Sequence, residues 1–85
     1  MAYTVIVAAP AARDLRKLPE DARRRIGRRI DALAGDPRPH GVRQLKGLPE
    51  LYRVRIGEYR AIYQIQDREL LVLVVQVRHR REVYR

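Results

Sequence analysis

The fold is decided by residues 51–85, which read LYRVRIGEYRAIYQIQDRELLVLVVQVRHRREVYR. Apolar and polar side chains alternate through much of this stretch, and β-branched and aromatic residues are frequent, as is typical of strands with one buried face. The pattern predicts three strands, over Leu51–Ile56, Tyr59–Gln66 and Glu69–Val77.

Two-residue loops join these predicted strands. Gly57-Glu58 suits a type II′ turn because glycine comes first, whereas Asp67-Arg68 is a poorer turn and fixes the next register less firmly. The first turn pairs Arg55 with Arg60, with Cβ atoms about 5 Å apart, and places Arg53 on the same face. Directly opposed like charges destabilise a hairpin by up to roughly 1 kcal/mol, and no carboxylate on this face obviously offsets them. We therefore expect the cluster to bind an anion, such as a nucleic-acid phosphate. The alternative is three exposed arginines on a solvated sheet face.

The other face of the hairpin is apolar and should pack against helices. It carries Val54, Ile56, Tyr59, Ala61, Tyr63 and Ile65. The third strand is apolar on both faces from Leu71 to Val75, which indicates a central strand covered above and below. The arginine face would then lie over a floor of Leu73, Val75 and Ile62, and a low-dielectric floor strengthens the attraction between arginines and an anion.

The first half of the chain predicts one strand and two helices. The strand covers Tyr3–Ala8, the first helix Pro10–Leu18 and the second about Glu20–Ala34. Apolar residues recur at helical spacing on each helix. They are Ala11, Leu15 and Leu18 on the first, and Ala22, Ile26, Ile30 and Leu33 on the second. Gly35 is expected to cap the second helix, and Asp36–Glu50 to form a loop.

The predicted element order is β-α-α-β-β-β. This is an α+β fold in which a helical hairpin packs on one face of a small, mostly antiparallel sheet. The length of 85 residues predicts a single domain over residues 1–85.

The charge points to a polyanion as the partner. The net charge is +9, with 11 basic and 6 acidic residues in 1–50 and 8 and 4 in 51–85. A small domain of this charge attracts nucleic acid, an acidic protein or an anionic membrane. The chain has no cysteine, no recognisable signal peptide and no apolar run long enough to span a bilayer. We therefore expect a soluble, cytoplasmic protein without a membrane anchor.

The end of the last strand adds His79, Arg80 and Tyr84 to the candidate residues. Histidine titrates near neutrality, and tyrosine can stack on a base or give a proton. If side chains alternate strictly along the strand that follows the Asp67-Arg68 turn, His79 lies on the arginine face and Arg80 lies on the opposite face. The plain alternatives are an exposed histidine and a tyrosine packed on the sheet rim.

The second predicted helix is rich in arginine. It carries Arg23, Arg24, Arg25, Arg28 and Arg29. Like charges four residues apart are mildly destabilising on a helix. A solvated helix face is the default interpretation, and a second patch that follows an RNA backbone is the alternative.

Motifs for several other chemistries are missing. The sequence has no His/Cys/Asp/Glu cluster at metal-ligand spacing, no phosphate-binding GxxxxGK[ST] loop, no GxGxxG and no GxSxG. Thr4 is its one serine or threonine. We therefore expect no metal and no small-molecule cofactor, and a hydroxyl nucleophile of the protein fits poorly.

Three fragments together resemble the RelE/ParE superfamily of toxin–antitoxin toxins, and within it the RelE branch. They are KLPEDARRRIGRRIDALAGDP, QLKGLPELYRVRIGEYRAIYQI and LLVLVVQVRHRREVYR, and the similarity runs from Tyr3 to Arg85. The resemblance implies a toxin that enters the ribosomal A site and cuts mRNA without a metal, by attack of the RNA 2′-hydroxyl on the adjacent phosphate. It implies two partners, the ribosome with its mRNA and a cognate antitoxin protein, and a +9 surface suits both.

The working residues of the RelE branch carry over by position. The strand-two cations match Arg53 and Arg55, the arginine of the GxYR-like segment matches Arg60, the late arginine matches Arg80, and the tyrosine of the EVY segment matches Tyr84. Arg60 and Arg80 would hold the phosphate, while Arg53 and Arg55 would position the backbone and stabilise developing charge.

The chain departs from the best-known RelE toxins at strand two, where they have lysines and one is often proposed as general base. Arginine practically never deprotonates, so His79 or Tyr84 would supply the base, or cleavage would depend mostly on positioning. Two alternatives are a ParE-type toxin that inhibits DNA gyrase without nuclease activity, and an RNA-binding or antitoxin-binding module whose nuclease activity has decayed. Arg60, Arg80 and Tyr84 favour the nuclease over the ParE type.

Overall fold

The computed structural model describes residues 2–83, which form five strands and three helices. In chain order these are β1 (Thr4–Val7), α1 (Ala9–Arg16), α2 (Glu20–Ala32), β2 (Arg43–Leu45), β3 (Leu48–Ile56), β4 (Tyr59–Gln66), β5 (Leu71–His79) and α3 (Arg80–Val83). No helix within this range is long and apolar enough to cross a membrane.

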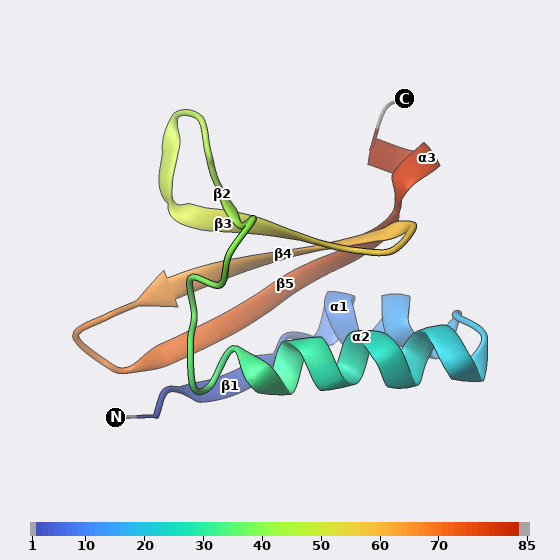
Figure 1. Cartoon of the computed structure of the whole chain (residues 1–85), viewed down its shortest axis with the longest axis horizontal. Helices are drawn as coiled ribbons and strands as arrows, with labels where there is room; N and C mark the ends of the chain where they lie inside the picture. The colour runs from blue at the N-terminus through green and yellow to red at the C-terminus, as the bar shows by residue number, and fades with distance from the viewer. Residues whose placement is uncertain (1, 84–85) are drawn as a thin grey trace.

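The strands form one mixed sheet in the order β1-β5-β4-β3-β2. β1 runs parallel to β5, and the other neighbours are antiparallel. Helices α1 and α2 cover one face of the sheet, whereas the β2–β3 hairpin and α3 rise on the opposite side (Figure 1). The predicted α+β class is thus confirmed, including the position of β5 as an inner strand.

The core lies between the two long helices and the apolar face of the sheet. Helix α2 contributes Ala22 and Ile26, and α1 contributes Ala11, all buried. Across from them, Tyr63 of β4 is fully buried and its hydroxyl donates a 2.7 Å hydrogen bond to the carbonyl of Pro37. Burial raises the pKa of Tyr63, because the phenolate would lose its hydration there. The helical stripes predicted from spacing are therefore the ones that pack.

The predicted loop over residues 36–50 is only partly a loop. Its second half forms β2 and the start of β3, joined by a turn at Lys46-Gly47 in which Gly47 has a φ of 78°. A three-residue edge strand gives little periodic signal, and β2 is held by its pairing with β3 rather than by propensity.

The connection between β4 and β5 also differs from the prediction. It spans four residues, Asp67–Leu70, rather than two, and Leu70 takes a left-handed φ of 50°. Further along, β5 contains one extra residue, because Ile62 pairs with Gln76 while Tyr63 pairs with Val74. This bulge inverts the alternation of every later side chain on β5.

Both long helices end two residues before the predicted positions. Helix α1 ends at Arg16 and α2 at Ala32, and Gly35 is not a left-handed cap, since the positive-φ glycines of residues 2–83 are Gly41, Gly47 and Gly57. The last carbonyls of α2 are instead satisfied by a tightened final turn, with bonds from the amides of residues 33–35 to the carbonyls three residues before them.

Replacement of Ile26 by alanine should test the core directly. Ile26 is fully buried, so Ile26→Ala should lower the free energy of unfolding by about 2–5 kcal/mol, measured by urea denaturation. Ile6→Ala is the matched control, because Ile6 is 46% exposed and its truncation should cost less than about 1 kcal/mol. Equal losses for the two variants would contradict this core.

Candidate anion-binding site

Four arginines from three neighbouring strands line one hollow of about 440 Å³. Arg43 comes from β2, Arg53 and Arg55 from β3, and Arg60 from β4, with Gly41 completing the lining. The sheet register brings them together, because Arg43 pairs with Arg53 and Arg55 pairs with Arg60. We call this feature the arginine hollow. Its described lining consists of four cationic side chains and one glycine, so the hollow carries the positive charge that binds an anion.

The β3–β4 turn fixes the geometry of the arginine hollow. The predicted Gly57-Glu58 turn is confirmed, with Ile56 paired to Tyr59 and a φ of 60° at Gly57. Arg55 Nε donates to the Gly57 carbonyl at 3.4 Å, which holds its stem at the turn. Arg60 is only 7% exposed, so its guanidinium lies in a reduced dielectric, where an anion is attracted more strongly than in water.

Arg43 was missed by the sequence reasoning because it falls in the segment predicted as a loop. A local signal was present: Lys46-Gly47 is flanked by Leu45 and Leu48, as expected for a short hairpin turn. Assigning that hairpin would have placed Arg43 on a strand beside the arginine face.

His79 does not lie on the arginine face. The β5 bulge places it across from Tyr59 on the helix side of the sheet, and the two rings meet edge to face with centroids 5.2 Å apart. His79 Nδ1 accepts a 3.1 Å hydrogen bond from the amide of Arg81, so the ring helps to begin α3. The prediction that His79 lies on the arginine face was therefore wrong, because it assumed strict alternation along β5 without a bulge.

Arg80 and Tyr84 follow at the end of the chain. Arg80 is exposed, opens α3, and donates its backbone N–H to the carbonyl of Glu58 at 2.7 Å. This bond holds the start of α3 at the β3–β4 turn, next to Gly57 of the hollow's own hairpin. Tyr84 lies outside the described residues.

The residue that β5 places across from Arg60 is Arg78, which the sequence reasoning did not select. Arg78 Nη1 lies 3.0 Å from Asp14 Oδ1 of α1, and Asp14 Oδ2 accepts a 3.0 Å hydrogen bond from the amide of Val77. The Asp14 side chain is 12% exposed, so this carboxylate ties α1 to the edge of β5. We assign Arg78 a structural ion pair.

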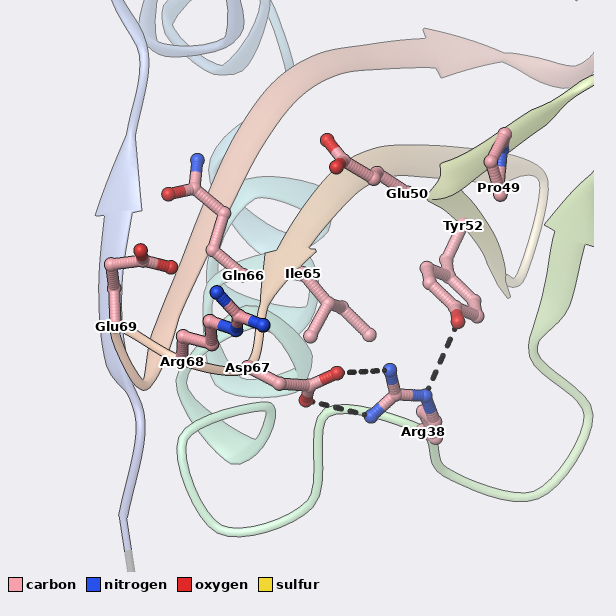
Figure 2. A pocket seen from close by; sticks show the side chains of 9 residues that line it. All are labelled: Arg38, Pro49, Glu50, Tyr52, Ile65, Gln66, Asp67, Arg68 and Glu69. Carbon is pink, nitrogen blue, oxygen red and sulfur yellow. Dashed lines mark hydrogen bonds and ion pairs between the residues drawn. The ribbon is translucent and has the colours of Figure 1, made fainter.

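A second cavity, of about 700 Å³, lies at the other end of the β3–β4 hairpin (Figure 2). Its charged lining is mixed, with Glu50, Asp67 and Glu69 against Arg38 and Arg68. Although it is larger than the arginine hollow, its three carboxylates disfavour an anion. We therefore place the candidate site in the arginine hollow.

The second cavity is closed on one side by a charged clasp. Arg38 reaches both carboxylate oxygens of Asp67 at 3.1 and 2.9 Å, and its Nε donates to the Tyr52 hydroxyl at 3.3 Å (Figure 2). The Tyr3 hydroxyl donates to the same carboxylate at 2.6 Å. These bonds, from Arg38 first and Tyr3 second, lower the pKa of Asp67 to about 2. The clasp joins the N-terminal segment, the α2–β2 loop and the β4–β5 turn.

Comparison with known proteins identifies the family. A family model described as the ParE toxin of type II toxin–antitoxin systems, parDE, matches residues 5–84. The mRNA interferase toxin RelE of Escherichia coli (strain K12) is 31% identical, over 99% of this chain and 92% of that protein. The chain belongs to the RelE/ParE toxin superfamily. Within it, this RelE-family toxin is also 34% identical to toxin RelG of Mycobacterium tuberculosis, over 100% of this chain and 99% of that protein.

Solved structures agree with this assignment. RelE in the archaeal RelE–RelB complex from Pyrococcus horikoshii has a TM-score of 0.83 and 29% identity, covering 94% of this toxin and 97% of that chain. The isolated E. coli RelE toxin has a TM-score of 0.80 and 29% identity, covering 98% and 92%. The predicted family and RelE-like fold are both confirmed.

Acid unfolding should reveal the clasp. An unfolded aspartate has a pKa of about 4, so a folded pKa of about 2 means that ionised Asp67 stabilises the fold above pH 4 and loses this effect as the pH falls toward 2. Asp67→Asn should therefore lower the thermal midpoint at pH 7 and lose less stability on acidification than the unmodified chain. Glu69→Gln removes a charge from the same turn as a control. Parallel acid curves for Asp67→Asn and the unmodified chain would contradict the clasp.

Proposed function

We propose that this toxin is a ribosome-dependent mRNA endonuclease that holds RNA phosphates in the arginine hollow. The observation that carries the proposal is the convergence of Arg43, Arg53, Arg55 and Arg60 on one hollow. Guanidinium groups donate two parallel hydrogen bonds to a phosphate and keep their charge at any physiological pH. The 31% identity to an mRNA interferase supports the same activity.

The proposed reaction is an in-line transesterification. The 2′-oxygen of one ribose attacks the adjacent phosphorus, the bond from phosphorus to the 5′-oxygen of the next nucleotide breaks, and the products are a 2′,3′-cyclic phosphate and a free 5′-hydroxyl. The 2′-hydroxyl gives up one proton and the leaving 5′-oxygen gains one, so the reaction consumes nothing else. Negative charge builds up on the phosphoryl oxygens, where preorganised donors have their largest effect.

Each arginine then has a proposed role. Arg60 and Arg80 hold the scissile phosphate, while Arg53 and Arg55 position the backbone and stabilise developing charge. Arg43 adds a cation from β2, and we propose that it contacts the phosphate next to the scissile one. The volume of the hollow, about 440 Å³, and its four arginines support contact with more than one phosphate.

The position of His79 bears on the choice of general base. His79 was one candidate, but its ring lies on the helix side of the sheet and its Nδ1 is engaged by the Arg81 amide. We therefore propose that His79 positions α3, which carries Arg80 and leads to Tyr84. Tyr84 is then the proposed group for base stacking or proton transfer, and positioning by the arginines supplies much of the remaining rate.

We propose a cognate antitoxin as the second partner, and the cytoplasm, where ribosomes are, as the location. The archaeal relative was solved as a RelE–RelB complex. A net charge of +9 favours an acidic antitoxin segment through electrostatic complementarity.

A ParE-type activity is the second candidate, because the matching family model is that of ParE toxins. Such a toxin would inhibit DNA gyrase without cutting RNA, and the arginine hollow would then have no catalytic role. Mutation of the hollow separates the two candidates. A decayed module that only binds RNA or an antitoxin would bind ribosomes without cutting.

Primer extension on mRNA from a purified translation reaction should test the nuclease. The unmodified toxin should cut at A-site codons only when ribosomes are present, and Arg55→Gln/Arg80→Gln should reduce cleavage by about a hundredfold or more. Both residues are exposed, so this variant should stay folded. Arg13→Gln/Arg16→Gln removes the same charge from α1 and should cut normally. Intact mRNA with the unmodified toxin would refute the nuclease, and DNA damage in cells would then favour the ParE type.

The role of His79 has its own test. Asparagine keeps an oxygen that can accept the Arg81 amide bond, so His79→Asn should retain cleavage within about threefold and leave the pH–rate profile unchanged. Loss of a limb of that profile near neutral pH would instead identify His79 as a titrating catalytic group.

A further inference from the structure

Helix α2 presents a ridge of arginines on the side away from the core. We define the arginine ridge as Arg24, Arg25, Arg28 and Arg29, all exposed. At 100° per residue these side chains occupy one continuous sector opposite and beside the buried stripe of Ala22, Ile26 and Ile30. Arg24/Arg28 and Arg25/Arg29 are like-charge pairs one turn apart, which weaken an isolated helix.

Acidic partners are scarce on this ridge. Arg24 pairs with Glu20 at 3.0 Å, but both side chains are more than two-thirds exposed and such a pair contributes little. Within residues 2–83, Arg25, Arg28 and Arg29 make no ion pair. Asp21 and Asp31 lie on the same helix, yet neither lies within ion-pair distance of an arginine in that range. The ridge therefore keeps its positive charge.

The arginine ridge meets the arginine hollow at Gly57. The Arg25 guanidinium lies 3.4 Å from the position that a Cβ of Gly57 would occupy, while Arg55 Nε donates to the Gly57 carbonyl from the other side of the hairpin. Cations from the helix layer and from the open face of the sheet thus touch the same residue. The ridge and the hollow therefore come together at this hairpin tip, where Glu58 is the acidic residue of the turn.

The composition of the ridge favours a nucleic-acid backbone over a protein. Protein interfaces usually centre on apolar or aromatic side chains in a desolvated patch. The sector of α2 that carries the ridge offers none larger than Ala32. Binding to a phosphate backbone needs no apolar centre, because it is driven by the release of counterions. The exposed large apolar residues of the described chain are Ile6 and Val7 on β1 and Leu48 on β3, and none lies on α2.

We infer that the arginine ridge of α2 is a second RNA-binding surface, continuous with the arginine hollow, that binds the sugar-phosphate backbone of folded ribosomal RNA. This inference rests on the proposed function, since it names the partner that the toxin would contact while mRNA occupies the hollow. The ridge contributes affinity for the ribosome, and the hollow contributes the chemistry.

Binding to purified ribosomes without mRNA tests the ridge independently of cleavage. The comparison is between Arg28→Gln/Arg29→Gln and Arg13→Gln/Arg16→Gln, which remove the same charge from exposed positions of α2 and α1. Glutamine is a good helix former, and the ridge variant relieves two like-charge pairs, so both proteins should fold. Affinity is measured by filter binding over a series of KCl concentrations, and folding is checked by circular dichroism.

The ridge variant should bind ribosomes roughly tenfold more weakly at moderate salt. The slope of log affinity against log salt should become shallower by roughly 1.5, about 0.7–0.9 for each lost phosphate contact. The α1 control should change the slope by less than half of that.

If the unmodified toxin fails to cut mRNA but the ridge variant still binds ribosomes more weakly, the nuclease proposal is refuted and the RNA-binding role of the ridge is retained. Equal slopes for the two variants would overturn the ridge, whether or not the toxin cuts. Unchanged ribosome binding with lost binding to poly-glutamate would also overturn it, in favour of an acidic protein.

Discussion

The register at Gly57 is the constraint on which the rest of the site depends. The β3–β4 turn places Arg55 directly across from Arg60, two cations where a hairpin would gain from opposite charges. The same register sends Val54, Ile56 and Tyr63 to the buried face. A one-residue slip would bury the arginines and expose the core, so burial of the apolar face pins the arginines where they repel one another. The hydrophobic core thereby stabilises a charge cluster that is unfavourable by itself.

Two described carboxylates that pair with arginines, Asp14 and Asp67, connect separate elements of the fold. Asp14 ties α1 to β5 through Arg78 and the Val77 amide, and Asp67 joins three segments through Arg38 and Tyr3. Each of these bonds lies outside the lining of the arginine hollow. This distribution separates two places for arginine in one small chain: Arg38 and Arg78 pair with carboxylates that hold elements together, whereas Arg43, Arg53, Arg55 and Arg60 line the hollow.

The sequence predicts the class of the fold because each long element carries a periodic apolar stripe of the expected length. The hairpin turn at Gly57 was predictable because glycine comes first in a two-residue loop. This turn fixes the register that brings Arg53, Arg55 and Arg60 to one face. Arg43 had only the Lys46-Gly47 turn as a local signal, because β2 exists through its pairing with β3. Arg78 had none, because the β5 bulge has no signature in the run LLVLVVQV. That bulge alone moves His79 to the other face and brings Arg78 beside Arg60. Errors in the candidate site thus arise where tertiary pairing overrides local pattern.

The most direct test of the arginine hollow is NMR observation of arginine Nε–H signals during titration with a short RNA. A trinucleotide with 2′-O-methyl groups on its first two riboses has no 2′-hydroxyl next to a phosphate, so it cannot be cleaved by this route and reports binding alone. Our account predicts the largest shifts for Arg43, Arg53, Arg55 and Arg60, with small changes at Arg13 and Arg16 of α1. Shifts of similar size at all exposed arginines, without preference for the hollow, would contradict it.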